Sequence, residues 1–184
     1  MILLIILISW LFFLKYFKKK SLNITKDVTT EKIINNGNAS SNYINNINYI
    51  STDVKGNKYQ ITAEVAEIEI GNSDVMFLKN IVSFIFIKDS DKVKITSDYG
   101  KYNSKNYDTI FSKNVIILYP GHKITSEYLD FSFLNNLGTI STDVIYTNND
   151  TKLVADRVEI NIITKDTKIF MYDETKKVVI EGAR

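Results

Sequence analysis

The sequence predicts an all-β domain of repeated strand units, and the first observation behind this is a phrase that returns four times. It consists of an apolar residue, Thr or Val, a small residue, an acidic residue and a larger one, at 61–65, 95–99, 124–128 and 153–157. The small residues, spaced 34, 29 and 29 apart, are Ala63, Ser97, Ser126 and Ala155. Self-similarity at this period indicates stacked supersecondary units. Because one unit cannot bury its apolar face alone, the copies must pack on one another.

The second observation is that the repeating unit has the pattern of a β-strand. Apolar residues recur at every second position, as at Val93 and Ile95. Clusters of Asn, Asp, Gly and Ser separate these segments, as strands joined by hairpins require.

The third observation is a slip of one residue in this alternation, just after the small residue of each copy. In the first copy, Ile61 and Ala63 are followed by Ala66, Ile68 and Ile70. A one-residue slip turns the following side chains to the opposite face, so each copy should contain a bulge or bend. The fold class predicted is an all-β sandwich or open roll of two curved antiparallel sheets.

A second marker accompanies the first at a distance of 18 residues. It is an apolar residue preceded by Asn or Asp, and it is formed by Ile81, Val115 and Val144 after Asn80, Asn114 and Asp143. The fourth copy has Asp173 at the apolar position.

The N-terminus differs from the rest of the chain. Residues 1–14 carry no charge, and Lys18, Lys19 and Lys20 follow shortly after. We interpret residues 1–20 as a transmembrane anchor with a basic flank, although the apolar run is close to the lower length limit of about 17 residues. Residues 21–48 are expected to be a linker, and residues 49–184 the β domain. A cleavable signal peptide is the alternative.

Composition argues against several functional classes. Residues 21–184 carry 19 basic and 21 acidic residues, so we expect no nucleic-acid binding. The chain has no cysteine, which excludes disulfides and thiol catalysis. Its one histidine, His122, follows Pro120 and Gly121 in a predicted turn. We therefore expect no metal site, no cofactor and no enzymatic activity.

Two segments, 81–87 and 115–119, are apolar at nearly every position. Such a strand can be buried on both faces. Alternatively, two sheets that close incompletely leave a lipid-sized apolar cleft, since ligand sites are mostly apolar concavities.

Four features occur together in this chain: the apolar N-terminus, the polar linker, the phrase Gly56-x-x-Tyr59-x-Ile61-x-Ala63 and its copy at 95–102. In these features the chain resembles the LptC family, the inner-membrane-anchored component of lipopolysaccharide export. The resemblance implies a single-pass inner-membrane protein with a periplasmic, boat-shaped β-jellyroll that holds lipid acyl chains in its interior. It also implies that lipopolysaccharide is taken from the LptB, LptF and LptG transporter and passed to LptA by edge-to-edge pairing of β-sheets.

Two sets of residues follow as hypotheses. The parity of the strands, with the apolar run at 81–87, predicts an acyl-chain lining of Ile68, Ile70, Phe84, Phe86, Tyr102, Phe131, Phe133, Ile160 and Ile162. The exposed ends of the sheet predict partner-binding edges at Gly56, Tyr59, Ile61, Val178, Val179 and Ile180.

Three alternatives remain open. The chain could be a membrane-anchored adaptor with the same repeats and no lipid cargo, or a soluble LptA-like bridge if the N-terminus is cleaved. A pilin-like subunit would need a long helix beyond residue 20, against which Asn23, Asn35, Asn36 and Gly37 argue.

Overall fold

A computed structural model describes residues 27–29, 33–34, 41–53, 56–173 and 175–182. In these residues twelve strands form one antiparallel sheet, with the order β1-β3-β4-β5-β6-β7-β8-β9-β10-β11, β2 beside β3 and β12 beside β10. The strands are β1 (Asp27–Thr29), β2 (Ile33–Ile34), β3 (Ser41–Thr52), β4 (Lys58–Glu69), β5 (Val75–Phe86), β6 (Val93–Asn103), β7 (Thr109–Tyr119), β8 (His122–Ser132), β9 (Leu137–Thr147), β10 (Thr151–Asn161), β11 (Thr167–Phe170) and β12 (Val179–Gly182).

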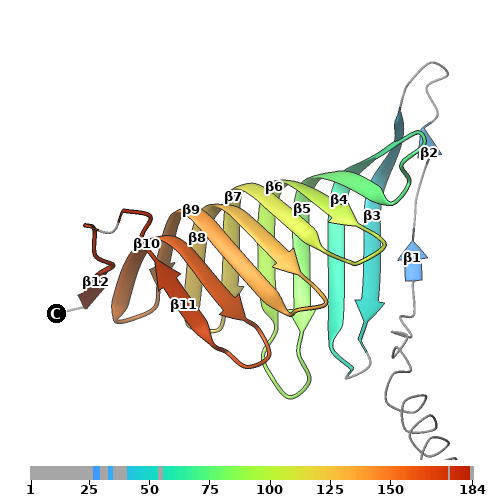
Figure 1. Cartoon of the computed structure of the whole chain (residues 1–184). Coiled ribbons are helices and arrows are strands. Elements are labelled where there is room, and N and C mark those ends of the chain that lie inside the picture. The colour runs from blue at the N-terminus through green and yellow to red at the C-terminus, as the bar shows by residue number, and fades with distance from the viewer. Residues whose placement is uncertain (1–26, 30–32, 35–40, 54–55, 174, 183–184) are drawn as a thin grey trace, which may run out of the picture.

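The sheet is folded over on itself, so that its two halves face each other as layers (Figure 1). The first layer comprises 47–52, 58–63, 81–86, 93–97, 115–119, 122–126, 144–147, 151–155 and β12. The second layer comprises 41–45, 65–69, 75–79, 99–103, 109–112, 128–132, 137–141, 157–161 and β11. The all-β prediction is confirmed, but the two predicted sheets are one continuous sheet. The reason is that each long strand from β3 to β10 bends in its middle and belongs to both layers.

The bend lies at the small residue of the repeated phrase. Each small residue is paired directly with a branched aliphatic residue, in the pairs Ile47–Ala63, Ile81–Ser97, Val115–Ser126 and Val144–Ala155. All eight side chains are buried. The hydroxyls of Ser97 and Ser126 donate to the carbonyls of Tyr99 and Tyr128 across the bend, at 2.9 and 3.3 Å. The small side chain leaves room for the strand to turn, and the serine hydroxyl is satisfied where it is buried.

The predicted parity slips are confirmed by the burial pattern. On β6, for example, Ile95 and Ser97 face inward before the bend, and Gly100 and Tyr102 face inward after it. The corresponding inward positions on the other even-numbered strands are Ile61, Ala63 and Ala66 on β4, Ser126, Leu129 and Phe131 on β8, and Leu153, Ala155 and Val158 on β10.

The odd-numbered strands bend through residues with left-handed backbone conformation. β3 and β5 each have one, Asn46 and Asn80, whereas β7 and β9 have two in succession at 113–114 and 142–143. Four of the strand pairs show a shift of register, and each of these pairs includes β7 or β9. The second left-handed residue therefore acts as the extra residue of a β-bulge. This explains the Asn or Asp of the second sequence marker, because these residues adopt the left-handed region more readily than most.

A side-chain hydrogen bond recurs on the outside of the bend. The Asn80 amide donates to the Glu64 carboxylate at 2.5 Å, and the Asn114 amide donates to the Asp98 carboxylate at 2.6 Å. The fourth acidic residue, Asp156, accepts from the backbone N–H of Tyr172 at 2.8 Å. The first two bonds each connect the bend of one strand to the bend of the next, and the third repeats the same 16-residue spacing with a partner that follows β11.

The bend of β9 has an acidic residue, Asp143, where the bends of β5 and β7 have Asn80 and Asn114. Asp143 lies 16 residues after Glu127, so two carboxylates occupy the position of a donor and an acceptor. We expect Asp143→Asn to supply the missing donor and to raise the free energy of unfolding by about 0.5–1 kcal/mol. The urea midpoint measures this, and Asn114→Asp should lower it by a similar amount. An unchanged midpoint in both variants would contradict a stabilising role for the outer hydrogen bonds.

Gly100 packs tightly against the strands on either side of β6. A Cβ atom there would collide with Ile81 Cδ1 and would lie 2.8 Å from the carbonyl oxygen of Ile110. We expect Gly100→Ala to reduce the free energy of unfolding by about 1–3 kcal/mol, as overpacking does. Gly138→Ala is the matched control, because its added Cβ would have ordinary 3.5 Å contacts with Ile160 and Leu129. Equal stability of the two variants would contradict the close packing at Gly100.

The sheet begins earlier than the predicted domain boundary at residue 49. β3 starts at Ser41, and β1 and β2 pair with its outer edge. The predicted anchor, residues 1–20, lies outside the described residues. Among the residues that are described, no helix is long and apolar enough to cross a membrane.

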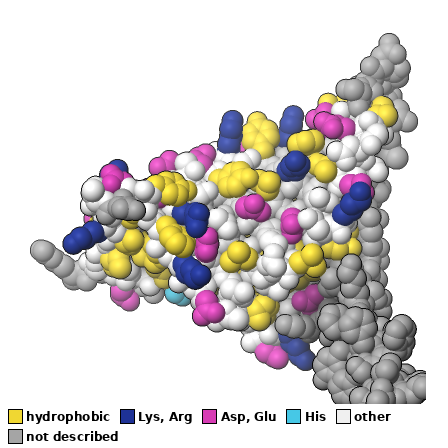
Figure 2. Space-filling view, in the orientation of Figure 1, with side chains coloured by type: hydrophobic (Ala, Val, Ile, Leu, Met, Phe, Trp, Pro, Cys, Tyr) yellow, Lys and Arg dark blue, Asp and Glu magenta, His cyan; other side chains and the backbone are white. Residues whose placement is uncertain are grey.

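The outer surface mixes side-chain types. Figure 2 shows hydrophobic, basic and acidic groups interspersed on the face that includes β11. Several outward aromatic rings are covered by lysine ammonium groups, with Lys101 over Phe77, Lys92 over Phe84 and Lys58 over Phe86 at 5.3–5.9 Å from the ring centroids. These contacts shield apolar rings that the sheet cannot bury.

Candidate lipid-binding interior

The space between the two layers contains two apolar compartments. The larger has a volume of about 340 Å³ and extends from the second half of β5 to β10. Its wall is mostly aliphatic and aromatic and is formed by Ile85, Ile87, Val93, Ile95, Ile117, Tyr119, His122, Ile124, Leu129, Phe131, Gly138, Ile140, Tyr146, Ile160, Ile162 and Lys165. An apolar concavity with a few polar groups is typical of a small-molecule site.

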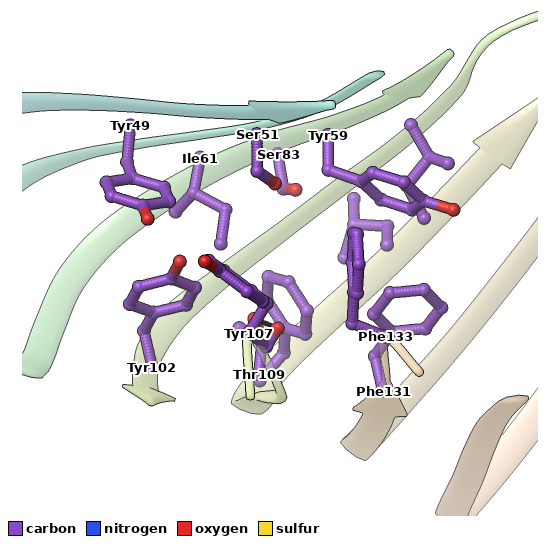
Figure 3. A pocket seen from close by; sticks show the side chains of 13 residues that line it. Tyr49, Ser51, Tyr59, Ile61, Ser83, Tyr102, Tyr107, Thr109, Phe131 and Phe133 are labelled. Atoms are coloured by element: carbon purple, nitrogen blue, oxygen red, sulfur yellow. Dashed lines mark hydrogen bonds between the residues drawn. The ribbon is translucent and has the colours of Figure 1, made fainter. Parts of the chain in front are cut away.

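The smaller compartment lies toward β3 and β4 and is nearly filled by aromatic rings (Figure 3). Tyr49 of the first layer faces Tyr102 of the second, with ring centroids 4.9 Å apart. The ring of Tyr59 meets Phe133 edge-on at 4.4 Å. The remaining volume is about 20 Å³, roughly enough for one water molecule.

Phe131 lines both compartments and separates them. Its ring centroid lies 6.1 Å from that of Tyr59, which comes from the opposite layer. The Tyr59 hydroxyl also donates to the side-chain oxygen of Asn136 in the β8–β9 turn, at 3.1 Å. Tyr59, Phe131 and Phe133 therefore connect the two layers where the packed end of the interior gives way to the hollow end.

The phenols of Tyr59 and Tyr102 at the packed end remain neutral over the physiological range. Burial is the main cause that raises the pKa of Tyr59 and of Tyr102 far above the usual value for a phenol. Both side chains therefore contribute apolar surface and a neutral hydroxyl, with no negative charge that would repel an anionic ligand.

The structure places five of the nine predicted lining residues inside. Tyr102, Phe131, Phe133 and Ile162 are buried, and Ile160 lines the larger compartment. Ile68 is half-buried beyond both compartments, in a register position that faces inward with Ala66. Ile70 is 67% exposed in the β4–β5 turn, so its predicted interior position is wrong. The alternation that placed it inside stops when β4 ends at Glu69.

The predicted interior positions of Phe84 and Phe86 are also wrong. On β5 the side chains of Ser83 and Ile85 point inward and are buried, so the two phenylalanines lie on the outer face. The run at 81–87 is apolar at both parities, and hydrophobicity alone therefore could not assign the faces. The buried Ser83 hydroxyl donates to the carbonyl of Gln60 at 2.9 Å, which lets a polar residue occupy an interior position.

Sequence reasoning missed part of the larger compartment, notably Ile117, Ile124, Ile140 and Tyr146. A signal for them existed. Ile117 and Tyr146 lie two residues after the buried Val115 and Val144 of the second marker, and Ile124 lies two residues before Ser126. Counting by two from each bend would have identified these inward positions.

The predicted partner-binding residues fall into two groups. Tyr59 and Ile61 are buried in β4, which is hydrogen-bonded to β3 and β5, so they are not at an edge of the sheet. Gly56 is exposed in the β3–β4 turn. At the other end, β12 pairs with the first half of β10, and Val179 and Ile180 are 49% and 65% exposed. Val178 precedes β12 and packs against the core.

Comparison with known families identifies the family of the chain. The family model described as "Lipopolysaccharide-assembly, LptC-related" matches residues 1–169. The chain belongs to the LptC family. Its role therefore lies in lipopolysaccharide assembly and transport, and the family is a transport component rather than a known class of enzyme. A search of curated proteins found no match.

Proposed function

We propose that this LptC-family chain carries lipopolysaccharide by holding its acyl chains in the larger compartment between the two layers. The observation that carries the proposal is the 340 Å³ cavity with an almost wholly apolar wall, in a chain whose family acts in lipopolysaccharide assembly. Each methylene group transferred from water into such a wall contributes about 0.8 kcal/mol, so an acyl chain supplies a large driving force.

The wider pathway belongs to the same proposal. Residues 1–20 would anchor the chain in the inner membrane and leave the β domain in the periplasm. The domain would take lipopolysaccharide from the LptB, LptF and LptG transporter and pass it to LptA. Two features support a carrier of this kind. The hollow runs across several strands, and in the described part of the chain no further strand pairs with the outer edges of the sheet, where another sheet could continue it.

Binding of the lipid in the larger compartment can be tested with two neighbouring residues of β7. Ile117 lines the larger compartment, whereas the side chain of Ile116 points to the outer face of β7. We expect a photoreactive amino acid at position 117 of the full-length protein to crosslink lipopolysaccharide in cells, and the same group at position 116 to give at least about tenfold less product. Immunoblotting for lipopolysaccharide on the purified protein measures the yield.

Equal yields at both positions would contradict binding between the layers. No crosslink at position 117, in a protein that is folded and present at normal level, would favour the adaptor without lipid cargo.

The docking of LptA can be tested at β12, which has no strand on its far side among the described residues. Strand addition needs backbone hydrogen bonds along a free edge. We expect deletion of 173–184, or Val179→Pro, to abolish copurification with LptA while the transporter complex stays intact, because proline removes an N–H and disrupts the strand. Val179→Thr, which keeps the N–H and favours a strand, is the control. Unchanged LptA recovery with the deletion and the proline variant would exclude this edge as the docking strand.

A further inference from the structure

The few polar groups in the wall of the larger compartment gather at its mouth. Tyr119 and His122 flank the two-residue turn between β7 and β8, and Tyr146 lies on β9 opposite Ile124. These three come from the first layer. Lys165 comes from the β10–β11 turn of the second layer, and its ammonium group lies 5.5 Å from the centroid of the Tyr119 ring. A cation is therefore held across the opening, above an apolar interior.

We propose that these four side chains form a binding site for a phosphate group on the lipid headgroup. This inference rests on the proposed function, because the site would hold the polar end of the lipid whose acyl chains occupy the compartment.

The hydrogen-bond network around His122 is compatible with an N–H donor that faces the ligand. Tyr146 Oη accepts from the Asn148 side-chain amide at 3.0 Å and lies 2.6 Å from His122 Nδ1. The phenol oxygen can either accept from Nδ1–H or direct its own hydrogen to Nδ1. The proposed site uses the second arrangement, in which Nδ1 accepts and the imidazole proton is on Nε2. Among the described residues Nε2 has no hydrogen-bond partner, so its N–H is available to a ligand.

Lys165 supplies the charge. None of the three salt bridges among the described residues includes its ammonium group. The neighbouring Asp166 carboxylate accepts instead from the Thr164 hydroxyl at 2.7 Å. An unneutralised ammonium group together with an N–H donor suits a phosphate, which offers several acceptor oxygens and a negative charge. The His122 ring also contacts two aromatic rings, with centroids 5.9 Å from that of Tyr119 in a tilted arrangement and 5.8 Å from that of Tyr146 in a stacked one, and these contacts help to position the imidazole.

The test compares two lipids that share their acyl chains. The full-length protein in detergent is titrated with phosphorylated lipid A and with the same lipid A after enzymatic removal of its phosphates. We expect the wild-type protein to prefer the phosphorylated form. Lys165→Gln and His122→Phe should each weaken binding of that form by about five- to tenfold and leave binding of the dephosphorylated form unchanged.

Lys168→Gln is the matched control. Lys168 lies on β11 opposite Glu159 and outside the compartment wall, and its replacement removes the same charge close to the same turn. It should retain the wild-type preference.

Equal binding of both lipids by the wild-type protein would overturn the phosphate site and leave the proposed carrier function standing. Equal loss for both lipids in the variants would also overturn it, since the residues would then act only on the shape of the mouth. Failure of the wild-type protein to bind either lipid would overturn the carrier function and the site together. Displacement of the phosphorylated lipid by equimolar inorganic phosphate would assign the site to the free ion instead.

Discussion

The bend in the middle of every long strand is the constraint on which the rest of the molecule depends. A strand that carries Ala or Ser opposite a branched aliphatic residue, as at Ala63 and Ile81, can turn without a steric clash and without an unsatisfied polar group. Repetition of this pair aligns the bends in a row and folds one sheet into two facing layers (Figure 1). The outer hydrogen bonds between acidic residues and Asn80 or Asn114 then connect successive bends. Without the aligned bends the sheet would have no interior.

The interior changes in character along the sheet. Toward β3 the rings of Tyr49, Tyr59 and Tyr102 fill the space between the layers, whereas toward β10 the inward residues are mainly isoleucines that leave the larger compartment. An aromatic ring extends further from the backbone than an aliphatic side chain, so it can reach the opposite layer where Ile117 or Ile124 cannot. The same folded sheet therefore has a rigid, packed end and a hollow end, with Phe131 at the boundary.

The inner and outer faces of the sheet differ in the side chains that they accommodate. Inward positions tolerate polar groups only where a partner is available, as for the Ser83 hydroxyl on the Gln60 carbonyl. Outward positions tolerate apolar rings where a lysine can lie over them, as for Phe84 and Phe86. At the mouth of the larger compartment the two sides meet. Aromatic and cationic groups from both layers lie together there, between an apolar wall and solvent.

The sequence by itself determined the all-β class, the period of the repeat and the place of the bend in the four strands that carry the repeated phrase, because a one-residue slip in alternation has a single geometric meaning. It also placed Tyr102 and Phe131 inside, since their strands alternate clearly, and the same alternation extends to Phe133 just after β8 ends. It could not assign Phe84 and Phe86, because a segment that is apolar at both parities has no preferred face. Only the tertiary structure decided this, by pairing β5 in a register that buries Ser83. The mouth of the compartment was equally beyond local pattern, because its groups come from the β7–β8 turn, from β9 and from the β10–β11 turn, which the folded sheet brings together.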